Sequence, residues 1–209
     1  MPATTDAIVA AATAEWEHWG KSTWNPATKA KFRGHIDDEE EFAQYVIDTY
    51  CKVAGGNPTT AQIANDEFAW SAVCISAIMA KAGFTKPEFP FSPSHSTYIR
   101  HFIKKRNEGD ATAAYWGFRL HEPEATPMVG DLIGYARADG ITFQKAQAFF
   151  DRTSPFTSHT DVVVARRPGE IDVIGGNVLD SVTMKTLRLA PDGSLADRNS
   201  PWFVVMRKR

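Results

Sequence analysis

The chain has 209 residues, of which 43% are hydrophobic and 23% are charged, and this composition is ordinary for a globular protein with a proper core. Its formal net charge of −2 argues against binding to nucleic acid or to an anionic membrane surface through bulk charge. The two cysteines, Cys51 and Cys74, are too few for a disulfide scaffold. No signal peptide and no apolar run of membrane-spanning length is apparent, so we expect no insertion into a membrane.

The first half of the chain is predicted to be helical, because apolar residues recur there at the helical period between capping residues and glycines. Thr5 or Asp6 is the expected cap of the first helix, and Ser94 is the expected cap of the last. The four predicted helices span residues 5–19, 42–53, 66–82 and 94–105.

The second half is predicted to form strands, because short runs rich in β-branched and aromatic residues alternate with turn residues. A helix near residues 142–150 is expected to interrupt them. The predicted strands span residues 115–120, 131–136, 160–165, 171–174, 181–189 and 202–206. Helices followed by an antiparallel sheet are typical of the α+β class. We therefore expect one domain over residues 1–209, with a helical N-terminal part (1–60) and a core (61–209).

The third predicted helix carries two candidate nucleophiles. Ser71 lies near its start, and Cys74 follows one turn later on a similar face. A helix N-terminus stabilises an anion and lowers the pKa of a thiol, so either residue is well placed for nucleophilic chemistry. A small residue early in a helix is more often a cap, however, and a cysteine on an apolar helix is more often buried and inert.

Residues 158–164 read Ser-His-Thr-Asp-Val-Val-Val and place His159 at the head of a hydrophobic strand. An imidazole held there is suited to proton transfer near neutral pH. Asp161 shares a strand face with His159, because side chains alternate along a strand. The two side chains have no third ligand at a recognisable spacing, so we do not expect a metal site.

Two further segments contribute polar side chains. Residues 174–177 read Ile-Gly-Gly-Asn, which most often marks a β-turn, although Asn177 could also hold a catalytic imidazole in one tautomer. Residues 89–98 place His95 in the first turn of a helix, where the helix dipole favours the neutral ring. His95 could line a pocket or join a capping network.

The order of these motifs resembles the bacterial family DUF2272, which is related to the papain-like NlpC/P60 and CHAP peptidases and amidases of the cell wall. The resemblance covers most of the chain, and each motif is weak alone. The residues that carry it are 14–16 (Ala-Glu-Trp), 69–72 (Ala-Trp-Ser-Ala), 91–99 (Phe-Ser-Pro-Ser-His-Ser-Thr-Tyr-Ile), 130–133 (Gly-Asp-Leu-Ile), 159–163 (His-Thr-Asp-Val-Val), 175–178 (Gly-Gly-Asn-Val) and 180–182 (Asp-Ser-Val).

The resemblance implies a papain-like fold of the NlpC/P60 type and a nucleophile–His–Asn triad without a cofactor. His159 would be the general base, and Asn177 would orient it. The nucleophile position falls on Ser71, where the related enzymes have cysteine after a tryptophan, and Cys74 remains the alternative. The side chains expected to contact substrate are Trp70, Ser94, His95, Tyr98 and Asp161.

The implied activity is hydrolysis of an amide bond in the peptide of peptidoglycan, in the periplasm or at the cell wall. A secreted antibacterial effector, with an immunity or inhibitor protein as its partner, would carry such a domain, and so would a phage lysis enzyme. The serine leaves a second interpretation open, in which the domain has lost catalysis and binds wall peptide or a protein partner.

Overall fold

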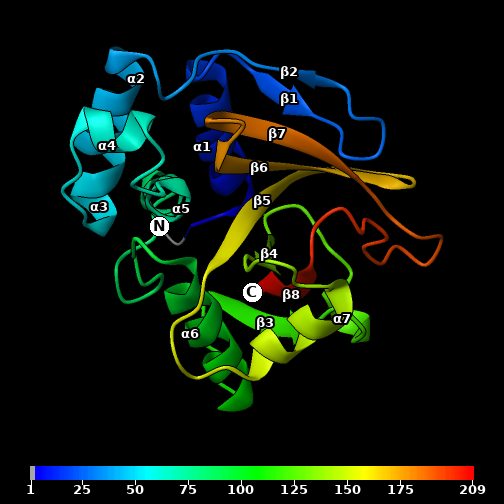
Figure 1. The fold of residues 1–209 in the computed structure, drawn as a ribbon. Helices are drawn as coiled ribbons and strands as arrows, with labels where there is room; N and C mark the ends of the chain where they lie inside the picture. The colour runs from blue at the N-terminus through cyan, green and yellow to red at the C-terminus, as the bar shows by residue number, and fades with distance from the viewer. Residues whose placement is uncertain (1–2) are drawn as a thin grey trace.

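The computed structural model describes residues 3–209 as an α+β fold built on a mixed sheet of eight strands. The strand order is β2-β1-β7-β6-β5-β4-β8-β3, and every neighbouring pair is antiparallel except β1 with β7 (Figure 1). The strands are β1 (Ser22–Trp24), β2 (Lys31–Phe32), β3 (Tyr115–Arg119), β4 (Leu132–Ala136), β5 (Ser158–Arg167), β6 (Glu170–Val178), β7 (Ser181–Arg188) and β8 (Trp202–Lys208).

The helices gather around α5 (Ser71–Lys81) and around β3. Helix α1 packs against α5 and β5, whereas α6 packs along β3, as Figure 1 shows. The remaining helices are α1 (Thr5–His18), α2 (Glu40–Tyr45), α3 (Lys52–Ala54), α4 (Thr60–Ala64), α6 (His95–Asn107) and α7 (Phe143–Ala146). A π-helical segment (Val46–Cys51) joins α2 to α3, and short 3₁₀ segments lie at Pro123–Ala125 and Gln147–Asp151.

The predicted α+β class and all six predicted strands are confirmed. The third predicted helix begins five residues too early, because α5 starts only at Ser71 and a separate short helix, α4, precedes it. The cap of α1 is Thr4, whose side chain accepts a hydrogen bond from the Ala7 N–H. The sheet is mixed rather than antiparallel, because β1 joins its edge alongside β7.

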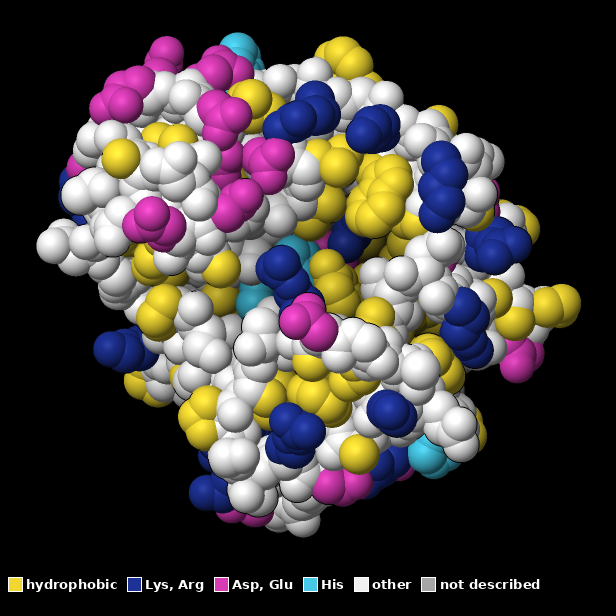
Figure 2. All heavy atoms as spheres, viewed as in Figure 1, with side chains coloured by type: hydrophobic (Ala, Val, Ile, Leu, Met, Phe, Trp, Pro, Cys, Tyr) yellow, Lys and Arg dark blue, Asp and Glu magenta, His cyan; other side chains and the backbone are white. Residues whose placement is uncertain are grey.

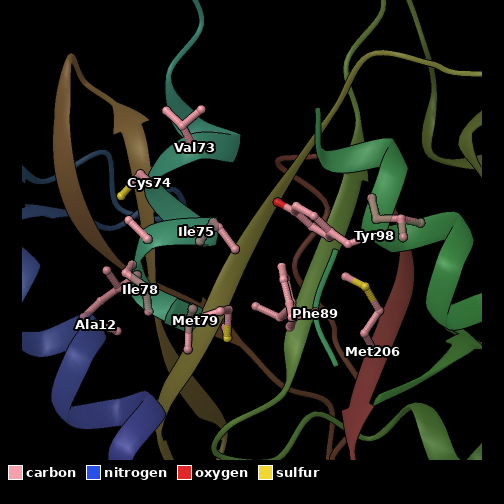
Figure 3. Close-up of a cluster of buried hydrophobic side chains, with 14 of the residues drawn as sticks. Ala12, Val73, Cys74, Ile75, Ile78, Met79, Phe89, Tyr98 and Met206 are labelled. Atoms are coloured by element: carbon pink, nitrogen blue, oxygen red, sulfur yellow. The ribbon is translucent and has the colours of Figure 1, made fainter. Parts of the chain in front are cut away.

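Both faces of the sheet are buried, which explains the run of three valines in β5. Val162 and Val164 pack with α1, α5 and α6 in the larger core, while Val163 packs in a second core on the opposite face. Figure 3 shows the larger core around α5, where Ile75 points toward Tyr98 and Phe89. We call the face of the sheet that carries Val162 the helical face.

Two glycines of β6 allow the helical layer and the polar side chains of β5 to approach the strand closely. A Cβ on Gly176 would lie 2.5 Å from Cys74 Cβ, and one on Gly175 would lie 2.0 Å from Asp161 Oδ1. The Gly-Gly-Asn segment therefore lies within a strand, and the hairpin turn that was expected at this motif follows it at Leu179 and Asp180, both with positive φ.

Replacing Gly176 by Ala is expected to lower the free energy of unfolding by about 1–3 kcal/mol, because α5 must move away from β6 to accommodate the methyl group. Urea unfolding followed by tryptophan fluorescence measures this change. An unchanged midpoint would show that the contact between α5 and β6 is looser than described.

Candidate active site

Ser71 is the first residue of α5 and lines a cavity of about 370 Å³ between the starts of α5, α6 and β5. The residues around this cavity, called the Ser71 cavity below, are Ala69, Ser71, Ala72, Pro93, Ser94, His95, Arg137, Pro155, Phe156, Thr157 and Ser158. Figure 2 shows histidine side chains at the floor of a hollow near the middle of one face, beside basic side chains. A hydroxyl at a helix start in a concave site has the setting of a nucleophile.

The hydrogen-bond partner of Ser71 is His95, the first residue of α6. Ser71 Oγ and His95 Nε2 are 2.7 Å apart in a buried contact, although 24 residues separate them in the chain. The sequence predicted His159 as this partner and His95 only as a wall of the site. The starts of two helices therefore meet at a hydroxyl–imidazole pair.

The other nitrogen of the His95 ring is held by two hydroxyl groups. His95 Nδ1 lies 2.8 Å from Thr160 Oγ1 and also contacts the Tyr98 hydroxyl, and these two hydroxyls are 2.8 Å from each other. When Nδ1 carries the proton and donates to one of them, the lone pair of Nε2 faces Ser71. Thr160 and Tyr98 thus occupy the orienting position that a carboxylate or an amide has in other triads.

Burial lowers the pKa of His95 well below its ordinary value, and the positive charges of His159, Arg137 and Lys185 add to this effect while Asp161 opposes it. The ring is therefore neutral at pH 7. A neutral imidazole next to a hydroxyl can accept its proton, so His95 has the protonation state that a general base needs.

His159 belongs to a separate polar cluster on the face of the sheet opposite the helical face. Its Nε2 atom lies 3.2 Å from Asp161 Oδ1, and Asp161 Oδ2 accepts a hydrogen bond from Lys185 Nζ at 2.7 Å. All three side chains are at most 2% exposed. The rings of His159 and His95 lie 5.1 Å apart, so the cluster is next to the Ser71–His95 pair without being bonded to it.

Successive side chains of β5 point to opposite faces of the sheet, and this explains why the predicted pairing of Ser71 with His159 does not occur. Thr160 shares the helical face with Val162 and reaches His95, whereas His159 and Asp161 share the other face with Val163. Within residues 3–209, His159 Nδ1 has no hydrogen-bond partner. Asn177, predicted to orient His159, therefore makes no hydrogen bond to that ring.

The alternative nucleophile, Cys74, lies outside the Ser71 cavity. Figure 3 shows its side chain pointing from α5 away from Tyr98, and Gly176 of β6 lies against its sulfur. The side chain is fully buried, and this burial raises the pKa of the thiol well above its ordinary value. A neutral, enclosed thiol is a poor nucleophile, so the geometry favours Ser71.

Of the five side chains predicted to contact substrate, Ser94 and His95 line the Ser71 cavity, whereas Trp70, Tyr98 and Asp161 are fully buried and do not. Tyr98 acts through its contact with His95, and Asp161 through its contacts with His159 and Lys185. Sequence reasoning missed Lys185 in particular. The signal for it was a charged residue two positions before Leu187 on a buried strand face.

Backbone N–H groups at the start of α5 are not used by the hydrogen bonds of the helix itself. The first helical hydrogen bond of α5 runs from Cys74 N–H to Trp70 O at 3.1 Å, so the N–H groups of residues 71–73 precede the helical ladder. Trp70, at the N-cap, makes no capping bond with its side chain. These donors are available to an anion that develops beside Ser71 Oγ.

Trp70 is anchored at this helix start by a buried carboxyl group. Its Nε1–H donates to Asp37 Oδ2 at 2.6 Å. Burial raises the pKa of Asp37, the hydrogen bond from Trp70 lowers it, and the negative charges of Asp180, Asp38 and Asp66 raise it, with a net value of about 6. Because this pKa is higher than in the unfolded chain, the stability contributed by Asp37 is complete below pH 4 and is lost as the pH rises through 6.

An Asp37→Asn variant is expected to be more stable than wild type above pH 6, by on the order of 1 kcal/mol, and to lose this advantage as the pH falls toward 4. The amide oxygen still accepts the Trp70 hydrogen bond but carries no buried charge. Urea unfolding at pH 4, 5, 6 and 7 measures the difference. A difference that does not change with pH would show that Asp37 has an ordinary pKa.

Two classes of feature are absent from the part of the chain that the structure describes. Among residues 3–209, no group of three or more His, Cys, Asp or Glu side chains is placed to hold a metal ion. No helix within this range has both the length and the apolar character needed to cross a membrane.

Comparison with known proteins gives one match. The family model described as "Uncharacterized protein conserved in bacteria (DUF2272)" matches residues 22–208, which is nearly the whole chain. No curated protein and no solved structure matches the chain significantly. The match spans Ser71, His95, His159 and Lys185 alike.

Proposed function

We propose that this chain, which belongs to the bacterial family DUF2272, is a hydrolase in which Ser71 is the nucleophile and His95 is the general base. The proposal is drawn from the geometry of the site, because the description of the family names no reaction. The observation that carries this proposal is the 2.7 Å contact between Ser71 Oγ and His95 Nε2 at the edge of the Ser71 cavity. A nucleophile, a base and an orienting group in series are the arrangement expected for acyl transfer.

The proposed reaction follows from the positions of these groups. His95 Nε2 accepts the Ser71 proton as Oγ attacks the substrate carbonyl, and the N–H groups at the start of α5 stabilise the oxyanion. His95 then donates this proton to the leaving nitrogen as the bond between carbon and nitrogen breaks. Water, deprotonated by the same ring, hydrolyses the acyl-serine and restores Ser71. Thr160 and Tyr98 keep Nδ1 in place throughout.

We further propose that the fold is papain-like and that the substrate is an amide bond in the peptide of peptidoglycan. A helix that carries the nucleophile at its start and packs against two neighbouring antiparallel strands, β5 and β6, supports this assignment. The resemblance to NlpC/P60 enzymes supplies the substrate class. The domain would then act in the periplasm or at the cell wall, as an antibacterial effector or a lysis enzyme, and an immunity protein would be its partner.

A fluorophosphonate probe tests the nucleophile directly, because it reacts covalently with activated serines. We expect labelling of the purified chain at Ser71, with release of soluble peptides from purified peptidoglycan sacculi. Ser71→Ala should abolish both, and Cys74→Ala should retain both. Labelling that survives Ser71→Ala, or is lost only in Cys74→Ala, contradicts the proposal.

A toxicity assay tests the proposed site of action. When the chain is directed to the periplasm of a bacterial host, we expect lysis that depends on Ser71. Cytoplasmic expression should be harmless, because peptidoglycan is not exposed there. Equal toxicity in both compartments would argue against the wall as the target.

One observation favours a second candidate, a domain that binds wall peptide without cutting it. Both groups at His95 Nδ1 are hydroxyls, and if they donate to Nδ1, the proton moves to Nε2 and Ser71 is no longer activated. Saturable binding of muropeptides with no probe labelling and no peptide release would select this candidate.

A further inference from the structure

His95 and His159 form a pair of imidazole rings inside the fold. Their centroids are 5.1 Å apart, and the two side chains are 5% and 0% exposed. Two positive charges at this separation repel each other strongly in a buried site. A proton on one ring therefore opposes a proton on the other, and the two rings titrate as a coupled pair.

The hydrogen bonds of the pair leave one ring nitrogen open. His95 Nε2 faces Ser71, His95 Nδ1 is held by two hydroxyls, and His159 Nε2 faces Asp161. In contrast, His159 Nδ1 is fully buried and has no partner in residues 3–209. An added proton can bind there without displacing a hydrogen bond. On His95 Nε2 it would take the place of the proton that Ser71 donates.

The charges in direct contact with the two rings also favour His159. Its Nε2 atom lies 3.2 Å from the Asp161 carboxylate, whereas the direct partners of His95 are uncharged hydroxyls. A carboxylate at this distance stabilises the protonated form of an imidazole. A hydroxyl carries no net charge and stabilises that form much less.

The other titratable groups around His159 do not reverse this order. Tyr135 lies against the ring at 5.0 Å and stays neutral, because burial raises the pKa of its hydroxyl. The positive charges of Lys185 and Arg137 oppose a proton on His159. Lys185 is already paired with the carboxylate of the same cluster at 2.7 Å, and Arg137 is exposed. Burial lowers the pKa of both rings, and it is the pKa of His95 that falls well below its ordinary value.

We propose that His159 makes this site sensitive to acid: it binds the first proton from solvent at Nδ1, and its charge then prevents His95 from accepting the proton of Ser71. The step forms one N–H bond and is reversed when the pH rises. His159 touches no reacting atom in the proposed reaction, so it acts through His95 alone. The effect on catalysis rests on the proposed function, whereas the order in which the two rings bind protons does not.

Nuclear magnetic resonance of the histidine ring nitrogens tests this order without any turnover. In wild type we expect His159 to bind a proton first, while His95 stays neutral at that pH. In His159→Gln, whose amide can still donate to Asp161 but binds no proton, His95 should bind its proton at least about one pH unit higher than in wild type. The control His121→Gln, at an exposed histidine, should change neither ring.

The wild-type titration stands alone if His159→Gln fails to fold, and His159→Asn is then the second variant. The inference is overturned if His95 binds a proton before His159, or if neither ring does so before the protein unfolds. It is also overturned if His95 titrates at the same pH with and without His159.

The rate of fluorophosphonate labelling between pH 4.5 and 8 tests the effect on catalysis. In His159→Gln the midpoint of the acid loss should lie at least about one pH unit below that of wild type, because the site no longer contains the group that is protonated first. A role of His159 in stability alone would not extend activity into acid. An unchanged midpoint overturns the inference. If the rings titrate in the expected order and no probe labels Ser71, only the hydrolase assignment fails.

Discussion

Replacing His95 by Gln is expected to slow the acylation of Ser71 by about 10²–10⁴-fold, the range by which a positioned general base accelerates proton transfer. Glutamine can still donate a hydrogen bond to Ser71 Oγ but cannot take its proton. His159→Gln is expected to slow acylation by less than about tenfold, because His159 is bonded to Asp161 and not to Ser71. The measurement is the rate of fluorophosphonate labelling, with kcat/KM on a nitrophenyl ester as a second readout.

The pH dependence of the same rate identifies the base. His95 must be neutral to accept the proton, so activity is lost as the pH falls through its pKa. Burial holds that pKa well below 6.5, with His159, Arg137 and Lys185 contributing and Asp161 opposing. We therefore expect kcat/KM to stay level between about pH 7 and pH 6 instead of halving near 6.5. A larger loss in His159→Gln than in His95→Gln would return the base to His159.

The difference between the predicted and the observed partner of Ser71 shows what the sequence can specify. Strand periodicity correctly places His159 and Asp161 on one face of β5, and their contact is observed. It does not specify which face meets the helices, because shifting the assignment by one residue exchanges the faces. That choice depends on packing far along the chain, where Thr160 and not His159 contacts α6.

The contact between Ser71 and His95 depends on how α5 and α6 are placed relative to each other, and no local pattern encodes that placement. The sequence did identify each of them as lying early in its helix, and this part is confirmed. The short helix α4 was missed although its signal is present. Thr59 and Gln62 form a capping box, with spacing typical of a helix start. Strands β1 and β2 have three and two residues, too few for a period to appear.

The cluster of His159, Asp161 and Lys185 is fully buried, so its disruption is expected to destabilise the fold strongly. Lys185 Nζ lies 2.7 Å from Asp161 Oδ2 and also faces the rings of Tyr135 and Trp202, at 5.3 and 5.5 Å from their centroids. Although burial by itself raises the pKa of Asp161, the charges of Lys185 and His159 bring that pKa down to about 2. The carboxylate therefore remains charged although its side chain is fully buried.

Lys185→Met is expected to lower the free energy of unfolding by about 3–5 kcal/mol at pH 7, because it leaves the Asp161 carboxylate buried without its cation. Lys86→Met, at an exposed lysine, is the control and should change stability by less than about 0.5 kcal/mol.

In wild type the stability that Asp161 contributes is present above pH 4 and is lost as the pH falls through about 2. In the variant the unpaired carboxylate binds a proton more readily, so the deficit should narrow as the pH falls from 7 to 4. Adding Asp161→Asn should recover part of the loss, since it removes the uncompensated charge. A deficit that does not change with pH and is not reduced by the second substitution would mean that Lys185 acts through packing alone.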